Sequence, residues 1–203
     1  MSTLSTKIAS LVFPGLTWKF PSRNKELFLT FDDGPHPVVT PKVLNILDEY
    51  KAKATFFCVG ENVQKHPETY ARILERGHRT GNHTFNHLKG WKTEKTEYLD
   101  NIGKCGELVD SRLFRPPHGR ITSKQAKMVA SSGYQIIMWS VLTKDYRQSS
   151  NREKLLQKAI RHTKPGSVVV FHDSEKAAEN MLWMLPGFLA YFSEKGFVFK
   201  VID

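Results

Sequence analysis

The sequence contains little cysteine, no long apolar run and no concentrated block of basic residues. Its two cysteines, Cys58 and Cys105, do not form a Cys-x-x-Cys pair, which favours two buried thiols in a reducing compartment, with one disulfide as the alternative. No apolar run approaches the roughly 18 residues that span a membrane. The formal net charge is +10, but the basic residues are scattered. We therefore expect a solvated basic surface, with no transmembrane segment and no nucleic-acid partner.

The N-terminal region has an apolar stretch at residues 8–13, which is soon interrupted by Pro14 and Gly15. Secretory signal peptides need an apolar region of about 7–15 residues, so this stretch is a poor match. We interpret residues 1–25 as an N-terminal arm and residues 26–203 as one domain. A cytoplasmic protein is expected on this ground, with association to the cell envelope as the alternative, and we expect a monomer.

Short apolar segments alternate with amphipathic segments along the chain. Strands are predicted at residues 26–31, 54–59, 78–82, 113–115, 134–141, 167–171 and 197–202. Helices are predicted at residues 41–50, 67–75, 94–109, 122–132, 152–162 and 175–193. Repeated β-α-β units imply parallel strands with right-handed crossovers. About seven such strands indicate an α/β protein with a barrel-like sheet.

Two adjacent carboxylates, Asp32 and Asp33, follow the first predicted strand and precede a Gly-Pro turn. Strand alternation would send the two side chains in opposite directions, but the turn can direct both into one cleft. Neighbouring anions are costly unless a metal ion or an arginine compensates them. The pair therefore indicates a functional site, with an ordinary β-turn as the alternative.

Ionisable residues also follow other predicted strands, at the ends where α/β barrels build their active sites. His83 and His87 are four residues apart, which on a helical turn would bring both rings to one metal ion. Two histidines and one carboxylate, with Asp33 as the carboxylate, are a familiar set of ligands for zinc or another divalent ion. The alternative is a pair of ordinary surface histidines.

Three further residues complete this group. Arg115 precedes Pro-Pro-His-Gly, a rigid loop, and could clamp a carboxylate through two hydrogen bonds. His172 ends an apolar strand and has a side chain suited to proton transfer near neutral pH. Asp145 could hold one ring nitrogen of that histidine and keep the ring protonated. The alternatives are an exposed arginine, a buried structural histidine and a turn aspartate.

The segments TFDDGP, HTFNH, RPPHG, KDY and VFH occur in this order along the chain. With them, the sequence resembles the polysaccharide deacetylases that have a NodB-like domain, carbohydrate esterase family 4. The resemblance covers residue 27 to the C-terminus, so we assign residues 26–203 to that domain. It implies a distorted (β/α) barrel with fewer than eight strands, and removal of acetyl groups from sugars such as chitin, peptidoglycan or xylan.

The resemblance also implies a role for each matching residue. Asp32 would be the catalytic base, Arg115 the residue that orients it, His172 the general acid and Asp145 the partner that tunes the acid. One divalent ion would be bound by Asp33, His83 and His87; zinc is expected, with cobalt, nickel or manganese as alternatives. Contacts with the oxyanion or the substrate are assigned to His118, Tyr146 and Trp139.

The sequence departs from the family pattern beside the predicted acid. The family often has Asp-x-x-Asp-Trp, whereas this chain has Leu142 and Tyr146 at the outer positions, and His118 replaces a frequent tyrosine. These changes bear on which acetylated glycan is the substrate. We expect a deacetylase that acts on an N-acetylated carbohydrate. One alternative is a related hydrolase acting on a small amide or cyclic imide; another is a non-catalytic module that binds glycans or nucleic acid.

Overall fold

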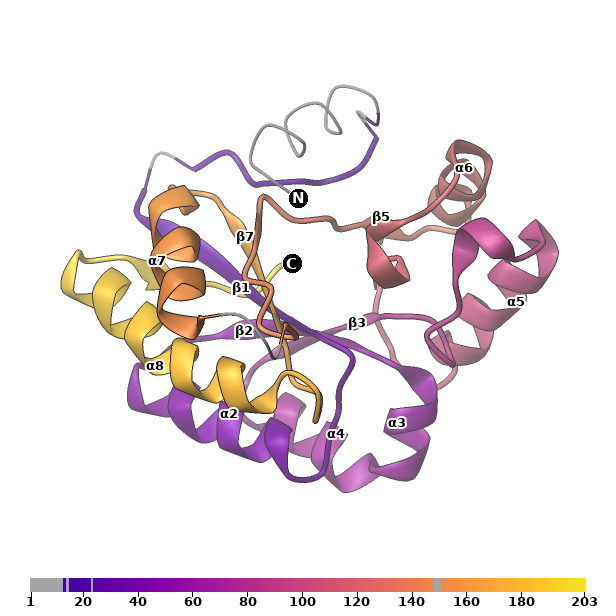
Figure 1. Cartoon of the computed structure of the whole chain (residues 1–203). Coiled ribbons are helices and arrows are strands. Elements are labelled where there is room, and N and C mark those ends of the chain that lie inside the picture. Colours follow the sequence, from indigo (N-terminus) through magenta and orange to yellow (C-terminus); the bar gives the residue numbers. More distant parts are fainter. Residues whose placement is uncertain (1–12, 14, 23, 148–150) are drawn as a thin grey trace.

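A curved sheet of parallel strands forms the centre of the computed structural model, which describes residues 13, 15–22, 24–147 and 151–203 (Figure 1). The strands are β1 (Glu26–Asp32), β2 (Ala54–Cys58), β3 (Arg79–Asn82), β4 (Leu113–Phe114), β5 (Gln135–Ile136), β6 (Val141–Leu142), β7 (Val168–His172) and β8 (Val198–Phe199). Their order across the sheet is β5-β4-β3-β2-β1-β7-β6, and β8 pairs with β1. The predicted α/β fold, a distorted (β/α) barrel of about seven parallel strands in a single domain, is confirmed.

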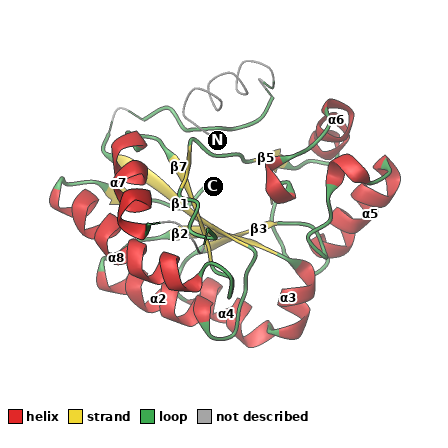
Figure 2. Cartoon of the chain, in the orientation of Figure 1, coloured by secondary structure: helices red, strands yellow, loops and turns green. Residues whose placement is uncertain are grey.

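Helices cover the outer face of this sheet, as Figure 2 shows in red around the yellow strands. They are α2 (Val39–Glu49), α3 (Gly60–Lys65), α4 (Pro67–Glu75), α5 (Lys95–Gly106), α6 (Ser123–Ser131), α7 (Arg152–His162) and α8 (Ala178–Glu194), with 3-10 turns at Gly90–Lys92 and Pro117–Gly119. Helix α3 has only six residues, too few for its apolar periodicity to be recognised in the sequence. No helix among the described residues is both long and apolar enough to cross a membrane.

Strand β1 separates two environments by simple alternation. Leu29 and Phe31 are fully buried against the helices, and the Phe31 ring stacks on Phe56 with a centroid distance of 4.9 Å. Burying such a side chain is worth about 1.5–3 kcal/mol. Thr30 and Asp32 point to the opposite face, because successive side chains of a strand alternate. The apolar face thus anchors the strand while its other face carries polar groups inside the barrel.

The predicted strand at residues 134–141 is instead two short strands, β5 and β6, separated by residues 137–140. The carbonyl groups of Ile137 and Met138 accept hydrogen bonds from the Arg115 side chain, so this segment also serves a buried cation. Strands β5 and β6 lie at opposite ends of the strand order, which is why one continuous strand cannot join them.

The N-terminal segment joins the chain just after edge strand β5 to the chain just before β7, the neighbour of the other edge strand. Thr17 forms a parallel bridge with Ile137, and Lys19 forms an antiparallel bridge with Ser167. In Figure 1 this indigo segment crosses the sheet at one end. The described part of the predicted arm is therefore packed on the barrel, whereas residues 1–12 lie outside the described residues. The domain boundary at residue 26 stays a prediction.

Candidate active site

The two aspartates at the end of β1 lie on one side of a tight turn. Asp32 is buried and is in register with His172 on the neighbouring strand β7. Asp33 is only partly buried and has a φ angle of 79°, in the left-handed region. The Asn62 amide donates a hydrogen bond of 2.8 Å to the Asp33 carbonyl and fixes this unusual backbone. The change of backbone direction brings both carboxylates to the carboxyl end of the sheet.

Arg115 lies beneath Asp32 and is completely buried. Its Nη1 donates to Asp32 Oδ1 at 2.6 Å, which compensates the buried carboxylate. The expected two-bond clamp is not formed. Three further guanidinium N–H groups donate to Thr30 Oγ1, at 2.7 Å, and to the backbone carbonyls of Ile137 and Met138. The guanidinium carbon also lies 4.0 Å from the centre of the Phe57 ring. Arg115 is therefore held by several partners and fixes Asp32 in turn.

His83, His87 and Asp33 form a cluster in which one ligand atom from each residue lies within 4.8 Å of the others. His87 Nε2 is 3.2 Å and His83 Nε2 is 3.7 Å from Asp33 Oδ1. The expected helical turn between the histidines is wrong: residues 83–87 form an irregular bend, with positive φ angles at Thr84 and His87. The bend still places the two rings 5.1 Å apart.

The buried ring of His83 is oriented by a backbone carbonyl. Its Nδ1 lies 2.7 Å from the carbonyl oxygen of Arg115, so Nδ1 carries the proton and Nε2 keeps its lone pair toward Asp33. Burial, with a smaller contribution from His87, lowers the pKa of His83 to about 4. A neutral imidazole with a free Nε2 is the form that binds a metal ion.

The carboxyl group of Asp33 is ionised in this setting. Burial alone would raise its pKa, but the hydrogen bond from His87 and the charge of His172 hold the pKa well below its usual range. One anionic oxygen and two histidine nitrogens are the donor set of many open divalent-metal sites. The three residues therefore fit a divalent ion.

His172 and Asp145 form a hydrogen-bonded pair at the carboxyl end of β7. Asp145 is completely buried, and its Oδ1 lies 2.7 Å from His172 Nδ1. Burial alone would lower the pKa of His172, but the charge and hydrogen bond of Asp145, with smaller contributions from the Asp33 and Asp32 charges, raise it to about 9. His172 is therefore a protonated imidazole at neutral pH.

Aromatic rings lie beside the metal-ligand cluster and beside the pair of His172 and Asp145. The exposed His118 has a φ angle of 59°, and its ring centre lies 4.7 Å from His87 and 5.5 Å from Trp91. Tyr146 meets His172 edge-to-face at 5.0 Å. These rings form two walls, one beside the metal ligands and one beside the protonated histidine.

Two residues named in the sequence analysis, Trp139 and Leu142, belong to or pack against a hydrophobic cluster of the barrel. Trp139 is 6% exposed and packs under Gly119, where any side chain would run into its ring. Leu142 is partly buried and packs against the barrel interior. A substrate contact of Trp139 therefore stays a prediction, and its observed contacts are with the loop that carries His118.

Supporting residues near the site escaped the sequence analysis. Thr30 binds Arg115, and strand alternation would have placed it on the face of Asp32. Asn62 and Asn180 act through loop carbonyls; Asn180 donates to the carbonyl of Asp145 at 2.9 Å. Asparagines that bind distant loop carbonyls leave no pattern in the sequence, so the fold was needed to find them.

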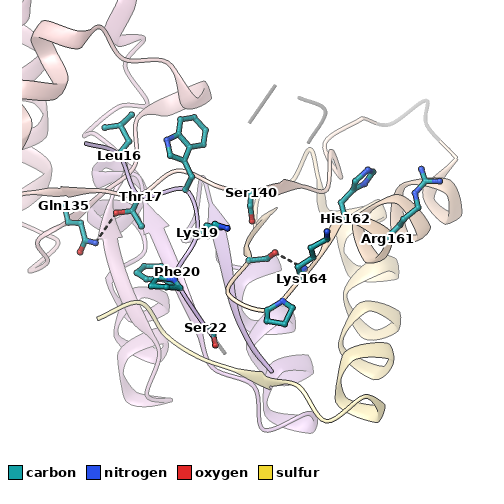
Figure 3. A pocket seen from close by; sticks show the side chains of 14 residues that line it. Leu16, Thr17, Lys19, Phe20, Ser22, Gln135, Ser140, Arg161, His162 and Lys164 are labelled. Atoms are coloured by element: carbon teal, nitrogen blue, oxygen red, sulfur yellow. Dashed lines mark hydrogen bonds between the residues drawn. The ribbon is translucent and has the colours of Figure 1, made fainter. Parts of the chain in front are cut away.

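A separate groove of about 1100 Å³ lies near the amino-terminal ends of the strands, away from these residues (Figure 3). It is lined by the N-terminal segment and by residues before β6 and β7, with Lys19, Arg161 and Lys164 among them. None of the predicted site residues lines this groove. Its size therefore does not identify the reaction centre, which the side-chain geometry places at the opposite ends of the strands.

Known proteins share both the sequence pattern and the fold. The family described as Polysaccharide deacetylase matches residues 19–137. A peptidoglycan-N-acetylglucosamine deacetylase of Bacillus cereus is 34% identical over 93% of this chain and 91% of its own length. A chitooligosaccharide deacetylase of Azorhizobium caulinodans is 33% identical over 85% of each chain.

A solved structure supports the same assignment. The crystal structure of a peptidoglycan N-acetylglucosamine deacetylase in complex with 4-naphthalen-1-yl-N-oxidanyl-benzamide has a TM-score of 0.89, covering 95% of this chain and 94% of that one at 31% identity. The α/β barrel of this chain carries a cluster of two histidines and one aspartate that fits a divalent metal ion. The chain belongs to the polysaccharide deacetylase family, whose members are generally metal-dependent.

Proposed function

We propose that this protein is a metal-dependent hydrolase that removes acetyl groups, in the first place N-acetyl groups, from a carbohydrate such as a chitin oligosaccharide or peptidoglycan. The observation that carries the proposal is the register of β1 and β7, which sets Asp32 beside His172. One is a carboxylate compensated by Arg115, and the other is an imidazole whose pKa is raised to about 9. A proton acceptor and a proton donor thus flank the cluster of Asp33, His83 and His87.

The proposed ion is zinc, bound by these three residues, for which two nitrogens and one carboxylate oxygen are suitable ligands. When bound, such an ion polarises the acetyl carbonyl and lowers the pKa of a coordinated water toward about 7. His83 is prepared for this role because Arg115 fixes its tautomer. The ion's identity rests on the donor set alone, so cobalt, nickel and manganese belong in the same test.

Asp32 is proposed as the general base that accepts a proton from the attacking water. Its Oδ1 is already bonded to Arg115, so Oδ2 is the oxygen available for the transfer. Arg115 also keeps the carboxylate in one orientation, because its other donors are tied to fixed partners. A base that is held in place loses little free energy to reorganisation during the reaction.

His172 is proposed as the general acid that protonates the leaving amine. Its Nδ1 is bound by Asp145, so the proton that can be transferred is on Nε2. An amine leaves poorly as an anion, and a histidine that is protonated at neutral pH removes this difficulty. The backbone near His118 is proposed to stabilise the oxyanion. Acetate and a free amino sugar are the products.

The experiment that tests the proposal measures acetate release from chitin, peptidoglycan and xylan fragments, with added zinc and after chelation. Release from one class that disappears with the chelator and returns with zinc is expected. Asp32→Asn should abolish release while zinc remains bound, and Asp110→Asn, at an exposed position, is the matched control. Absence of release from every glycan by the zinc-loaded protein would contradict the proposal, and small amides would then be the next substrates to assay.

A further inference from the structure

Asp173, the residue after His172, is completely buried and has no role in the steps described above. Its Oδ1 accepts a hydrogen bond of 3.1 Å from the backbone N–H of Gly34, and its Oδ2 accepts one of 2.5 Å from the Thr40 hydroxyl. Both donors are uncharged. Burial raises the pKa of Asp173 to about 7, although the Thr40 hydrogen bond opposes this shift.

Burying a carboxyl group at this position carries a free-energy cost for the fold. Removing an ionised carboxylate from water is costly unless a cation pairs with it, and an apolar or amide side chain of similar size would avoid much of that cost. Neutral donors recover only part of the lost hydration free energy. The reason for an acid here is therefore to be sought in the contacts that it makes.

The contacts of Asp173 supply such a reason, because they converge on the turn that carries both active-site aspartates. Its side chain binds Gly34, and its own backbone N–H donates to the Asp32 carbonyl at 3.2 Å. The approach to Gly34 is so close that a β-carbon there would run into the Asp173 carboxylate. The turn is thus held from both sides of Asp33 by the residue that directly follows β7.

Thr40 extends this arrangement to the first turn of helix α2. Its hydroxyl donates to Asp173 and accepts a hydrogen bond of 2.8 Å from the backbone N–H of His36. The segment between Asp33 and α2 is therefore anchored at Gly34 and again at His36. Both anchors depend on the two oxygens of Asp173, one directly and one through Thr40.

We propose that Asp173 is a positioning residue that fixes the turn carrying Asp32 and Asp33 against the strand that carries His172. The proton acceptor, one metal ligand and the proton donor then keep constant separations, although Asp173 touches neither the substrate nor the metal ion. The roles of these three residues rest on the proposed function. The positioning itself rests on the hydrogen bonds of Asp173.

The test compares Asp173→Asn, Thr40→Val and Thr40→Ser with the exposed control Asp110→Asn. Asparagine has one acceptor oxygen, so its NH₂ group faces either the N–H of Gly34, which cannot accept, or the Thr40 hydroxyl, which would have to accept instead of donate. Thr40→Val removes the hydroxyl and so excludes this reversed hydrogen bond. We measure Co²⁺ affinity and the visible absorption spectrum of the Co²⁺-loaded protein, together with kcat, KM and the melting temperature. Loss of a group that supports metal ligands typically costs 10–100-fold in metal affinity or activity.

We expect Asp173→Asn to weaken Co²⁺ binding and lower kcat by about 10-fold or more, with an altered Co²⁺ spectrum and a nearly unchanged KM. Thr40→Val should act in the same direction, and Thr40→Ser, which keeps the hydroxyl, should restore wild-type values. If Asp173→Asn does not fold, the two Thr40 variants decide. A lower melting temperature with unchanged kcat, Co²⁺ affinity and spectrum would overturn the inference.

The same measurements separate this inference from the proposed function. A wild-type protein that releases no acetate would contradict the proposed function, and a changed Co²⁺ spectrum in the Asp173 and Thr40→Val variants would still support the positioning role. Conversely, an active wild type whose Asp173→Asn and Thr40→Val variants both have the same kcat and Co²⁺ spectrum would leave the function standing and reject the positioning role.

Discussion

Each carboxylate oxygen of Asp145 accepts a hydrogen bond from His172. The backbone N–H of His172 donates to Oδ2 at 2.8 Å, and the ring Nδ1 is 2.7 Å from Oδ1. The Asn180 side chain donates to the backbone carbonyl of Asp145 at 2.9 Å, so the backbone that carries this carboxylate is anchored to helix α8. This pair sets both the direction of the His172 ring and its charge, which makes the pH dependence of the reaction a direct test.

We predict that Asp145→Asn moves the high-pH decline of kcat to lower pH. In the wild type the pKa of His172 is raised to about 9, so the acid form prevails below that value and activity falls above it. Without the Asp145 charge, burial favours the neutral ring and the pKa falls. Profiles of kcat against pH for the variant and for Asp110→Asn measure the change. Identical declines in all three proteins would contradict the assignment of His172.

Arg115 is predicted to be important for stability as well as for activity. It donates four hydrogen bonds, one of them to Asp32, from a fully buried position. Arg115→Met should lower the free energy of unfolding by about 3–5 kcal/mol, because Asp32 is then buried without its cation. Arg115→Lys keeps the charge but cannot reproduce all four bonds, so we expect a smaller loss. Urea unfolding monitored by fluorescence gives these values.

A double-mutant cycle separates the ion pair from the other contacts of Arg115. If the uncompensated charge dominates, Asp32→Asn should recover part of the stability that Arg115→Met loses. Strictly additive losses in the double variant would show instead that the carbonyl and Thr30 contacts account for the effect.

The sequence was sufficient for much of this arrangement because strand ends in parallel α/β sheets share one edge. Alternation and apolar runs identified β1 and β7, and so brought Asp32 and His172 together. The sequence alone was insufficient where loops decide the geometry of the site. The bend that joins His83 to His87 uses positive φ angles at non-glycine residues, which spacing alone does not reveal. The break after β5 was also missed, since it has no turn signal.

The metal site can be tested by comparing His87 with His118, whose rings meet edge-to-face. His87 is a predicted ligand, whereas His118 packs against it at 4.7 Å and is outside the ligand cluster. His87→Ala should weaken zinc affinity by about 100-fold or more, because it removes one of three protein ligands. His118→Ala should keep zinc affinity within a few-fold. Competition with a chromophoric chelator measures both, and equal losses would argue for a different set of ligands.

Tyr146 provides the last prediction, which concerns substrate binding. Its ring meets His172 edge-to-face at 5.0 Å and is partly exposed, so part of the side chain is accessible to a sugar beside the acid. Aromatic contacts of this kind are worth about 0.5–1.5 kcal/mol, which corresponds to a change of roughly 2–12-fold in KM. Tyr146→Ala should raise KM for the preferred glycan by this factor with a smaller effect on kcat. Tyr146→Trp, which restores the residue frequent in the family pattern, should keep KM low but alter the preference among chitin, peptidoglycan and xylan fragments. If Tyr146→Ala instead lowered kcat alone, the ring would act by orienting His172, and the binding surface would have to lie on the His118 side of the cleft.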